Sequence, residues 1–260
     1  RSASDLETTL RLMAGPDLLE AAAVRVELPQ LSGPLSALRI GVWKTDPMCP
    51  VSAAVQARVQ AVASALAGQG ASVDDTARPA FSAEHSHELF SALLSSAMAS
   101  RLPDADYAKA VARAGTLDPA DQSAGAKQIR WQTLRLRDWS AVNEARTRLR
   151  WAWHEFFQRF HFMVLPIMPT TAFPHEQGPL GERRIEVDGV RHPYFMQTFW
   201  AGLAGVAYLP ATVIPGGPGP DGLPIGVQII GPSYGDLRTI QLAQRLEQLG
   251  FVFQSPAACA

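Results

Sequence analysis

The chain has 260 residues, of which 47% are apolar and 18% are charged, and its formal net charge is −1. These values are typical of a globular protein with a sizeable core, and a charge so near zero excludes the long-range field that attracts nucleic acid or an anionic membrane. The two cysteines, Cys49 and Cys259, are too few for a disulfide framework, so we expect a reducing compartment, the cytoplasm.

No segment of the sequence predicts membrane association. No secretory signal precedes the first amphipathic segment, and the longest apolar run, residues 201–214, is shorter than the roughly 20 residues that span a bilayer. Arg1 stands where an initiator Met would be, which indicates a processed or truncated product. Across residues 1–260 we predict one core, with no second domain boundary.

The first part of the chain predicts a helix and then a βαβ unit. Residues 4–14 have apolar side chains at helical spacing, with Ser4 or Asp5 as the cap. A strand, a helix and a second strand follow, predicted at residues 38–43, 51–66 and 72–75. The connection between two such strands is expected to be right-handed.

The middle of the chain is predicted to be mainly helical. Helices are expected at 82–100 and 105–114, and apolar residues recurring every three or four positions over 119–159 predict one long helix or two. Leu149 lies on the apolar stripe of this pattern, whereas Arg150 lies on its polar side.

Strands dominate the last third of the chain. Residues 162–165 read as a buried strand, and Asp188-Gly189 predicts the tight turn of a surface hairpin. Residues 209–214 and 224–230 are rich in β-branched side chains and apolar on both faces, as strands inside a sheet covered on two sides are. The predicted fold class is therefore α/β, a mixed β-sheet covered by α-helices.

Two local details accompany these strands. Residues 215–223 are rich in glycine and proline and are expected to form a loop that continues neither helix nor strand. Asp236 is expected to be the N-cap of a closing helix.

The same region resembles a known family. LPATVIP (209–215) followed by GLPIGVQIIGPSYGD (222–236) is similar to the C-terminal signature of the amidase signature family, serine hydrolases that cleave amide C–N bonds. Four further matching segments occur upstream in the family's order: RSASDLETTLRLMAGPD, LRIGVWKTDPMCPVSAAV, LPIMPTTAFPHEQ and HPYFMQTFWAGLAG. The resemblance implies acyl transfer to a serine and then to water, with no cofactor.

The resemblance also implies that the catalytic residues lie elsewhere. The family uses a lysine, a serine before a cis peptide and a serine nucleophile, in a Gly/Ser-rich segment that precedes the motif with which this chain begins. The lysines here, Lys44, Lys109 and Lys127, lack a neighbouring serine pair, and Ser95-Ser96 lacks a lysine. We expect no catalytic residue in this chain and an N-terminal half supplied in cis or in trans.

Other motifs favour ordinary structural roles. His85 and His87 are two residues apart on a predicted helix and point in different directions, so no metal site is expected. The glycine-rich loop 216–222 lacks the Lys-Ser/Thr ending of a phosphate-binding loop. The arginines between 130 and 150 alternate with acidic residues and predict a solvated helix face.

Two loops are the best candidates for substrate contact. Residues 168–175 follow a buried strand, where ligands of open α/β sheets gather, and residues 194–202 are rich in aromatics. The predicted substrate-binding residues, which the resemblance places around the acyl pocket, are Thr170, Thr171, Phe173, Phe199 and Trp200. Core packing is the alternative role for the aromatic residues.

The sequence therefore predicts the C-terminal part of an amidase signature hydrolase that acts on a small-molecule amide. The alternative is a catalytically inactive amidase-like subunit, or a binding module, that needs a partner chain. Strands that are apolar on both faces leave exposed backbone edges and apolar surface unless other elements cover them. The isolated chain is therefore expected to form a homodimer or aggregate.

Overall fold

The computed structural model describes residues 2–255. Its α-helices are α1 (Ala3–Met13), α2 (Ala53–Gly68), α3 (Ala83–Ala99), α4 (Asp104–Gly115), α5 (Ala124–Gln132), α6 (Leu136–Arg159), α7 (Phe199–Val206) and α8 (Asp236–Glu247). Its strands are β1 (Arg39–Val42), β2 (Ser72–Asp74), β3 (Phe162–Pro166), β4 (Arg184–Val187), β5 (Val190–Pro193), β6 (Ala211–Pro218) and β7 (Pro224–Ile230). Short 3-10 segments are η1 (Glu20–Ala22), η2 (Leu35–Ala37) and η3 (Tyr194–Thr198).

Five strands form one mixed sheet in the order β2-β1-β3-β7-β6. β1 runs parallel to both β2 and β3, whereas β7 runs antiparallel to β3 and to β6. The predicted βαβ unit of β1, α2 and β2 is confirmed, as is the mixed α/β sheet. β4 and β5 form a separate ribbon, and its turn has positive φ at Asp188 (48°) and Gly189 (80°), as the Asp-Gly pair predicts.

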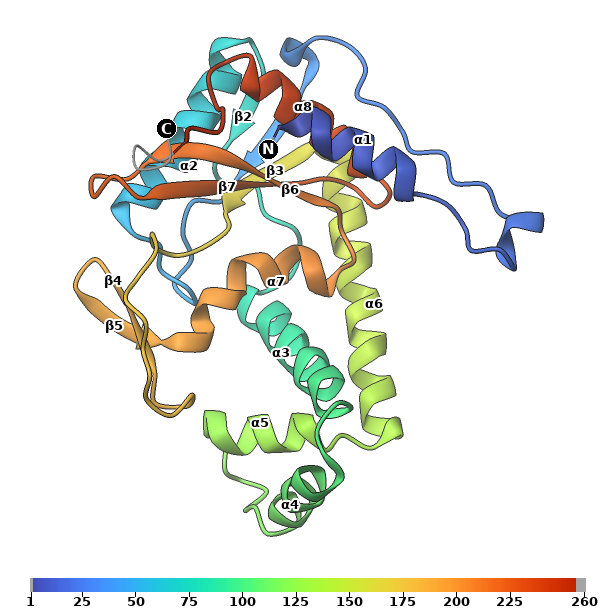
Figure 1. Ribbon diagram of the computed structural model, residues 1–260, viewed down its shortest axis with the longest axis vertical. Helices are drawn as coiled ribbons and strands as arrows, with labels where there is room; N and C mark the ends of the chain where they lie inside the picture. Colours follow the sequence, from blue (N-terminus) through green and yellow to red (C-terminus); the bar gives the residue numbers. More distant parts are fainter. Residues whose placement is uncertain (1, 256–260) are drawn as a thin grey trace.

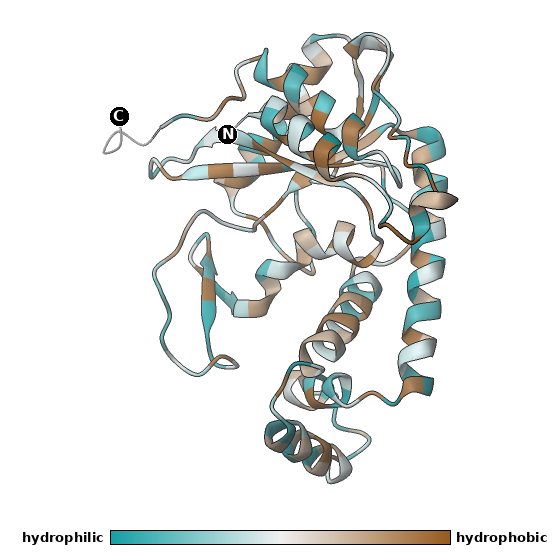
Figure 2. Cartoon of the chain, turned by 45° about the vertical axis from the view of Figure 1, so that its right-hand side comes forward, coloured by the Kyte–Doolittle hydropathy of each residue, from teal (hydrophilic) through white to brown (hydrophobic). Residues whose placement is uncertain are grey.

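Alternate side chains of the central strands enter two cores, one on each face of the sheet. On β3, Phe162 and Val164 join one cluster, and Met163 joins the other with Leu165. Figure 1 shows α1, α2 and α8 on one side of the sheet and α3, α6 and α7 on the other. The strands carry hydrophobic residues through the sheet, whereas α6 is largely hydrophilic where it stands away from it (Figure 2). The two-sided burial predicted for β3 and β7 is confirmed.

The prediction for residues 209–214 is wrong in one respect. β6 is the last strand of the sheet, and its side chains alternate between buried and exposed, with Val213 45% exposed. The prediction for 215–223 is also wrong, because β6 continues to Pro218 through a bulge between Pro215 and Gly217. An edge strand tolerates prolines because its outer N–H groups need no partner, and Gly217 (φ 104°) supplies the bulge.

Helix boundaries differ from the prediction at two places, the start of α1 and the cap of α8. α1 begins earlier, because Ser2 is its N-cap in a reciprocal capping box with Asp5. The long pattern forms two helices, separated at residues 133–135, which is one of the two predicted arrangements. Asp236 is not the N-cap of α8: Gly235 occupies that position, and Asp236 lies in the first turn, where the helix dipole favours a carboxylate.

Helices α3 and α7 pack closely at a glycine. A Cβ at Gly202 would lie 2.9 Å from the Phe90 ring, so only glycine allows this approach. His87 of α3 lies half-buried beside Phe90 and Phe199, with ring centroids 6.4 and 5.7 Å away. Its Nδ1 has no hydrogen-bond partner among the described residues, and burial lowers the pKa of His87.

The burial of α6 predicts a large stability difference between neighbouring residues. Leu149 is 3% exposed in the core, whereas the adjacent Arg148 side chain is 71% exposed. Leu149→Ala should lower the free energy of unfolding by about 2–5 kcal/mol through the lost contacts and the cavity. Arg148→Ala should change it by no more than about 0.5 kcal/mol. Urea unfolding checks both, and equal losses would contradict the packing of α6.

The buried position of His87 predicts part of the loss of unfolding free energy at acidic pH. Because its folded-state pKa lies below its unfolded value near 6.5, the unfolded chain takes up the proton first. The stability that neutral His87 contributes is therefore complete above pH about 6.5 and is lost as the pH falls below it. His87→Phe should flatten the decline in unfolding free energy between about pH 7 and 5.

The matched control is His85→Phe, since His85 is exposed on the same helix. His161 will leave some slope in both variants, because burial and then the charges of Arg39 and Arg238 also lower its pKa. Denaturant titrations at several pH values give the comparison. If both variants keep the wild-type slope, His87 does not titrate as described.

Candidate functional site

A small cavity opens at the carboxyl end of β3. Its volume is about 170 Å³, and its lining comes from α2, the loop after β3 and the start of β7: Val55, Ile167, Met168, Thr170, Thr171, Ala172, Phe173, Pro224, Ile225 and Gly226. Pro166 ends the strand, and the chain bends through residues 167–170, which include Pro169. Three of the predicted site residues, Thr170, Thr171 and Phe173, thus meet at one cavity.

Local hydrogen bonds fix this loop against the β6–β7 turn. Thr171 Oγ1 donates to Asp221 Oδ2 at 2.9 Å, and Asp221 Oδ1 accepts from the Leu223 amide at 3.0 Å. The Leu223 amide and then the Thr171 hydroxyl hold the pKa of Asp221 below its usual range. Phe173 meets Tyr194 edge to face, with centroids 6.1 Å apart. Thr170 lines the cavity among mainly apolar residues, and its hydroxyl has no hydrogen-bond partner among the described residues.

The other two predicted residues lie in the core. Phe199 is 1% and Trp200 0% exposed, and both meet Trp43 edge to face at 6.5 and 5.7 Å. Gln228 Nε2 donates to the Trp200 carbonyl oxygen at 3.2 Å. Neither aromatic ring lines the cavity, but both belong to the same core cluster as its wall residues Val55 and Ile225.

The lysines have acceptors other than serine. Their ammonium partners are Gln60 (2.8 Å) and Asp75 (3.5 Å) for Lys44, Asp106 (3.0 Å) for Lys109, and Glu88 (3.0 Å) for Lys127. Ser95 donates instead to Gln128 Oε1 at 3.1 Å. Among the described residues, no lysine is hydrogen-bonded to a serine hydroxyl, which is the contact a serine–lysine pair requires.

Cys49 is also unsuited to nucleophilic attack. Cys49 is fully buried, its thiol donates to the Met196 carbonyl oxygen at 3.4 Å, and burial raises its pKa to about 12. A thiol with that pKa is not a thiolate near neutral pH. Within residues 2–255, no group of three His, Cys, Asp or Glu side chains is arranged to hold a metal ion.

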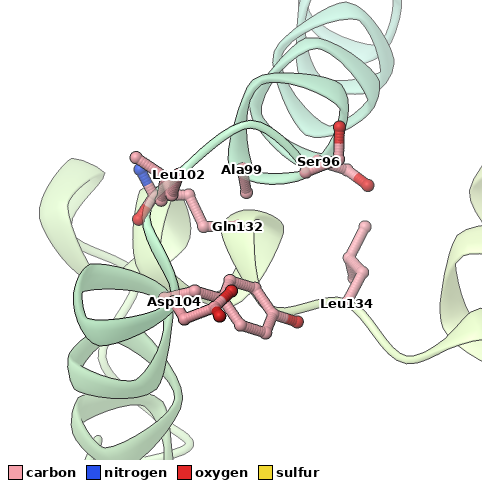
Figure 3. A pocket seen from close by; sticks show the side chains of 8 residues that line it. Ser96, Ala99, Leu102, Asp104, Gln132 and Leu134 are labelled. Carbon is pink, nitrogen blue, oxygen red and sulfur yellow. The ribbon is translucent and has the colours of Figure 1, made fainter.

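A second cavity, of about 260 Å³, lies between the end of α3, the start of α4 and the end of α5. Its lining residues are Ser96, Ala99, Ser100, Leu102, Asp104, Tyr107, Gln132 and Leu134. Figure 3 shows polar groups of Ser96, Asp104 and Gln132 around it, with Leu102 and Leu134 on opposite sides. Sequence reasoning missed it because three separate helical segments, none with a motif, build it.

Comparison with known proteins adds the family. Residues 1–240 match the family model described as Amidase. A glutamyl-tRNA(Gln) amidotransferase subunit of Synechococcus sp. (strain RCC307) is 26% identical over 270 residues, covering 95% of this chain and 53% of that protein. Within residues 2–255, every helix is too short or too polar to cross a membrane.

Two solved structures share the fold. A bacterial aryl acylamidase of the amidase signature family superposes with a TM-score of 0.67 at 19% identity, over 95% of this chain and 51% of that one. A vestigial protein complex, studied for the origins of an s-triazine catabolic enzyme, gives a TM-score of 0.71 at 22% identity, over 98% and 53%. Because the family match extends over most of its residues, this chain belongs to the amidase signature family and spans about half the length of the curated relatives it matches.

Proposed function

We propose that this chain is the C-terminal portion of a single-domain amide hydrolase. It supplies the acyl-binding side of the active site, and a polypeptide outside residues 1–260 supplies the serine nucleophile and its lysine. One observation carries the proposal. This chain spans about half the length of its relatives and has a cavity, lined by threonines and apolar residues, at the end of β3. Each of its lysines instead contacts a carboxylate or an amide.

The proposed reaction needs two bond exchanges. A serine oxygen attacks the amide carbon, the C–N bond breaks, and the lysine-relayed proton leaves with the amine. Water then attacks the acyl ester, releases the carboxylic acid and restores the serine hydroxyl. Neither exchange calls for a cofactor. The residues of this chain bind and orient the acyl group and take no part in the proton transfer.

Each predicted site residue has a place in this proposal. The Thr170 hydroxyl hydrogen-bonds the bound amide, and Thr171 keeps the loop in place through Asp221. Phe173 supplies an apolar wall. Phe199 and Trp200 support the cavity from behind through the core that they share with Val55 and Ile225.

The alternative is an inactive subunit that works only as part of an assembly. The Synechococcus relative is named as one component of an amidotransferase, which favours a partner-dependent role. Self-association into a homodimer and a cytoplasmic location remain predictions. An assembly of this chain with its partner that forms fully and still cleaves no amide would support the inactive subunit.

The first functional prediction concerns the chain by itself. Residues 1–260 alone should not hydrolyse aliphatic or aromatic amides, because within residues 2–255 no serine is hydrogen-bonded to a lysine that could take up its proton. The measurement is release of amine or aniline from a panel such as butyramide and acetanilide, with enzyme-free buffer as the baseline. Turnover proportional to the amount of folded chain would sink the proposal.

The second prediction concerns the cavity and needs no turnover. Butyramide and acetanilide should shift the backbone NMR signals of 170–173 and 225–226 saturably. Thr170→Val should weaken binding about 5- to 10-fold, since a net hydrogen bond contributes about 1 kcal/mol. Thr9→Val, at an exposed position on α1, is the matched control. Shifts spread over other surfaces, or equal affinities for all three proteins, would contradict the site.

A further inference from the structure

The second cavity lies where the ends of three helices meet, far from the sheet (Figure 1). Its walls come from the last turn of α3, the connection that follows, the first turn of α4 and the end of α5. It shares no lining residue with the cavity at β3. The two cavities are therefore separate features of the chain.

Four polar side chains of this cavity lack partners within the part of the chain that the structure describes. The side chains that make no hydrogen bond and no ion pair there are those of Ser96, Asp104, Tyr107 and Gln132. Ser100, by contrast, uses its hydroxyl within α3, where it donates to the Ala97 carbonyl oxygen at 2.7 Å. Because polar groups need partners, these four are free to contact a polar ligand without breaking a bond in this chain.

The electrostatics of the cavity favour a cation. Asp104 is the one charged residue among those that line it, whereas Arg101 and Arg135, which adjoin lining residues in the sequence, form no part of the wall. Helices α3 and α5 both end at the cavity, and the macrodipole makes a C-terminal end negative. The N-terminal end of α4 has the opposite sign, but Asp104 lies in its first turn and offsets it.

The cavity is large enough for the apolar body of an organic ligand. Its volume of about 260 Å³ exceeds the roughly 150 Å³ of an apolar cavity that holds benzene. Leu102 and Leu134 stand on opposite sides of it in Figure 3. Tyr107 is 40% exposed, so a ligand can reach its ring, and a cation is attracted to the face of such a ring.

These walls suit an organic ammonium better than a metal ion. Ca²⁺ takes about six to eight oxygen ligands and Mg²⁺ needs an octahedral set, whereas this cavity has one carboxylate. Within residues 2–255, no three His, Cys, Asp or Glu side chains are grouped to hold a metal ion. A protonated amine with an apolar group would use both the carboxylate and the leucine side chains.

We propose that the second cavity binds a small organic ammonium compound, a protonated amine that carries an apolar group about the size of one aromatic ring. The ammonium donates to the Asp104 carboxylate and to the unpartnered hydroxyl and amide oxygens around it. The apolar group lies between Leu102 and Leu134, beside the Tyr107 ring. This site does not depend on the proposed amide hydrolysis, because it shares neither residues nor ligand with the cavity at β3.

The test measures binding to the full chain of three ligands of similar shape: phenethylammonium, neutral 2-phenylethanol and anionic phenylacetate. In low-salt buffer, which preserves the charge attraction, phenethylammonium should shift the backbone NMR signals of residues 96–107 and 132–134 saturably. It should bind at least about 10-fold more tightly than 2-phenylethanol, because hydrogen bonds between charged groups are stronger than neutral ones. Phenylacetate should bind more weakly than either.

Asp104→Asn should remove the preference for phenethylammonium over 2-phenylethanol. Asp106→Asn is the matched control and should leave the preference unchanged, because Asp106 lies in the same turn of α4, pairs with Lys109 at 3.0 Å and does not line the cavity. Tyr107→Leu keeps an apolar wall and should reduce the preference about 2- to 5-fold by removing the contact between cation and ring. It also supplies the test if circular dichroism shows that Asp104→Asn perturbs α4.

Three results would contradict the proposal. Equal affinities for phenethylammonium and 2-phenylethanol, or equal effects of the two aspartate variants, would overturn the ammonium class. Shifts confined to residues 170–173 and 225–226 would assign the ligand to the cavity at β3 and overturn the second site. The absence of a saturable shift at about 10 mM ligand, ten times a Kd of about 1 mM, would overturn it as well.

Discussion

The burial of β3 on both faces and along both edges is the constraint from which the rest of the structure follows. Its alternate side chains enter the two cores, and its neighbours are β1 on one edge and β7 on the other. Helices must then cover both faces, because every side chain of this strand is buried and exposing these apolar groups to water would cost free energy. The loop that contains Thr170 to Phe173 begins at the end of the same strand, so β3 positions both the core and the candidate site.

What the sequence predicted well depends on a local cause. β3 and β7 are apolar at consecutive positions, and Asp188-Gly189 has the residues that positive φ requires, so each carries its own signal. β6 was misjudged because its composition resembles β7, while its exposure follows from being last in the sheet, which is a property of the whole fold. The cavity at β3 could be predicted as a strand-end loop. For Phe199 and Trp200 the sequence offered both substrate contact and core packing, and the structure shows core packing through contacts with Trp43 that no local pattern encodes.

Pocket and nucleophile are separable parts of an amide hydrolase, and we propose that this chain supplies the pocket. Thr170, Thr171 and Phe173 bound a cavity that can orient an acyl group, yet the polar chemistry around it ends with the Thr171–Asp221 hydrogen bond.

The most direct test of this account is to locate the reactive serine. Any longer polypeptide or assembly that contains this chain and cleaves an amide is treated with a fluorophosphonate, which labels an activated serine, and the labelled peptide is identified by mass spectrometry. The account predicts a single labelled serine in a Gly/Ser-rich segment outside residues 1–260. Label on Ser95, Ser96 or any other serine of this chain would contradict it.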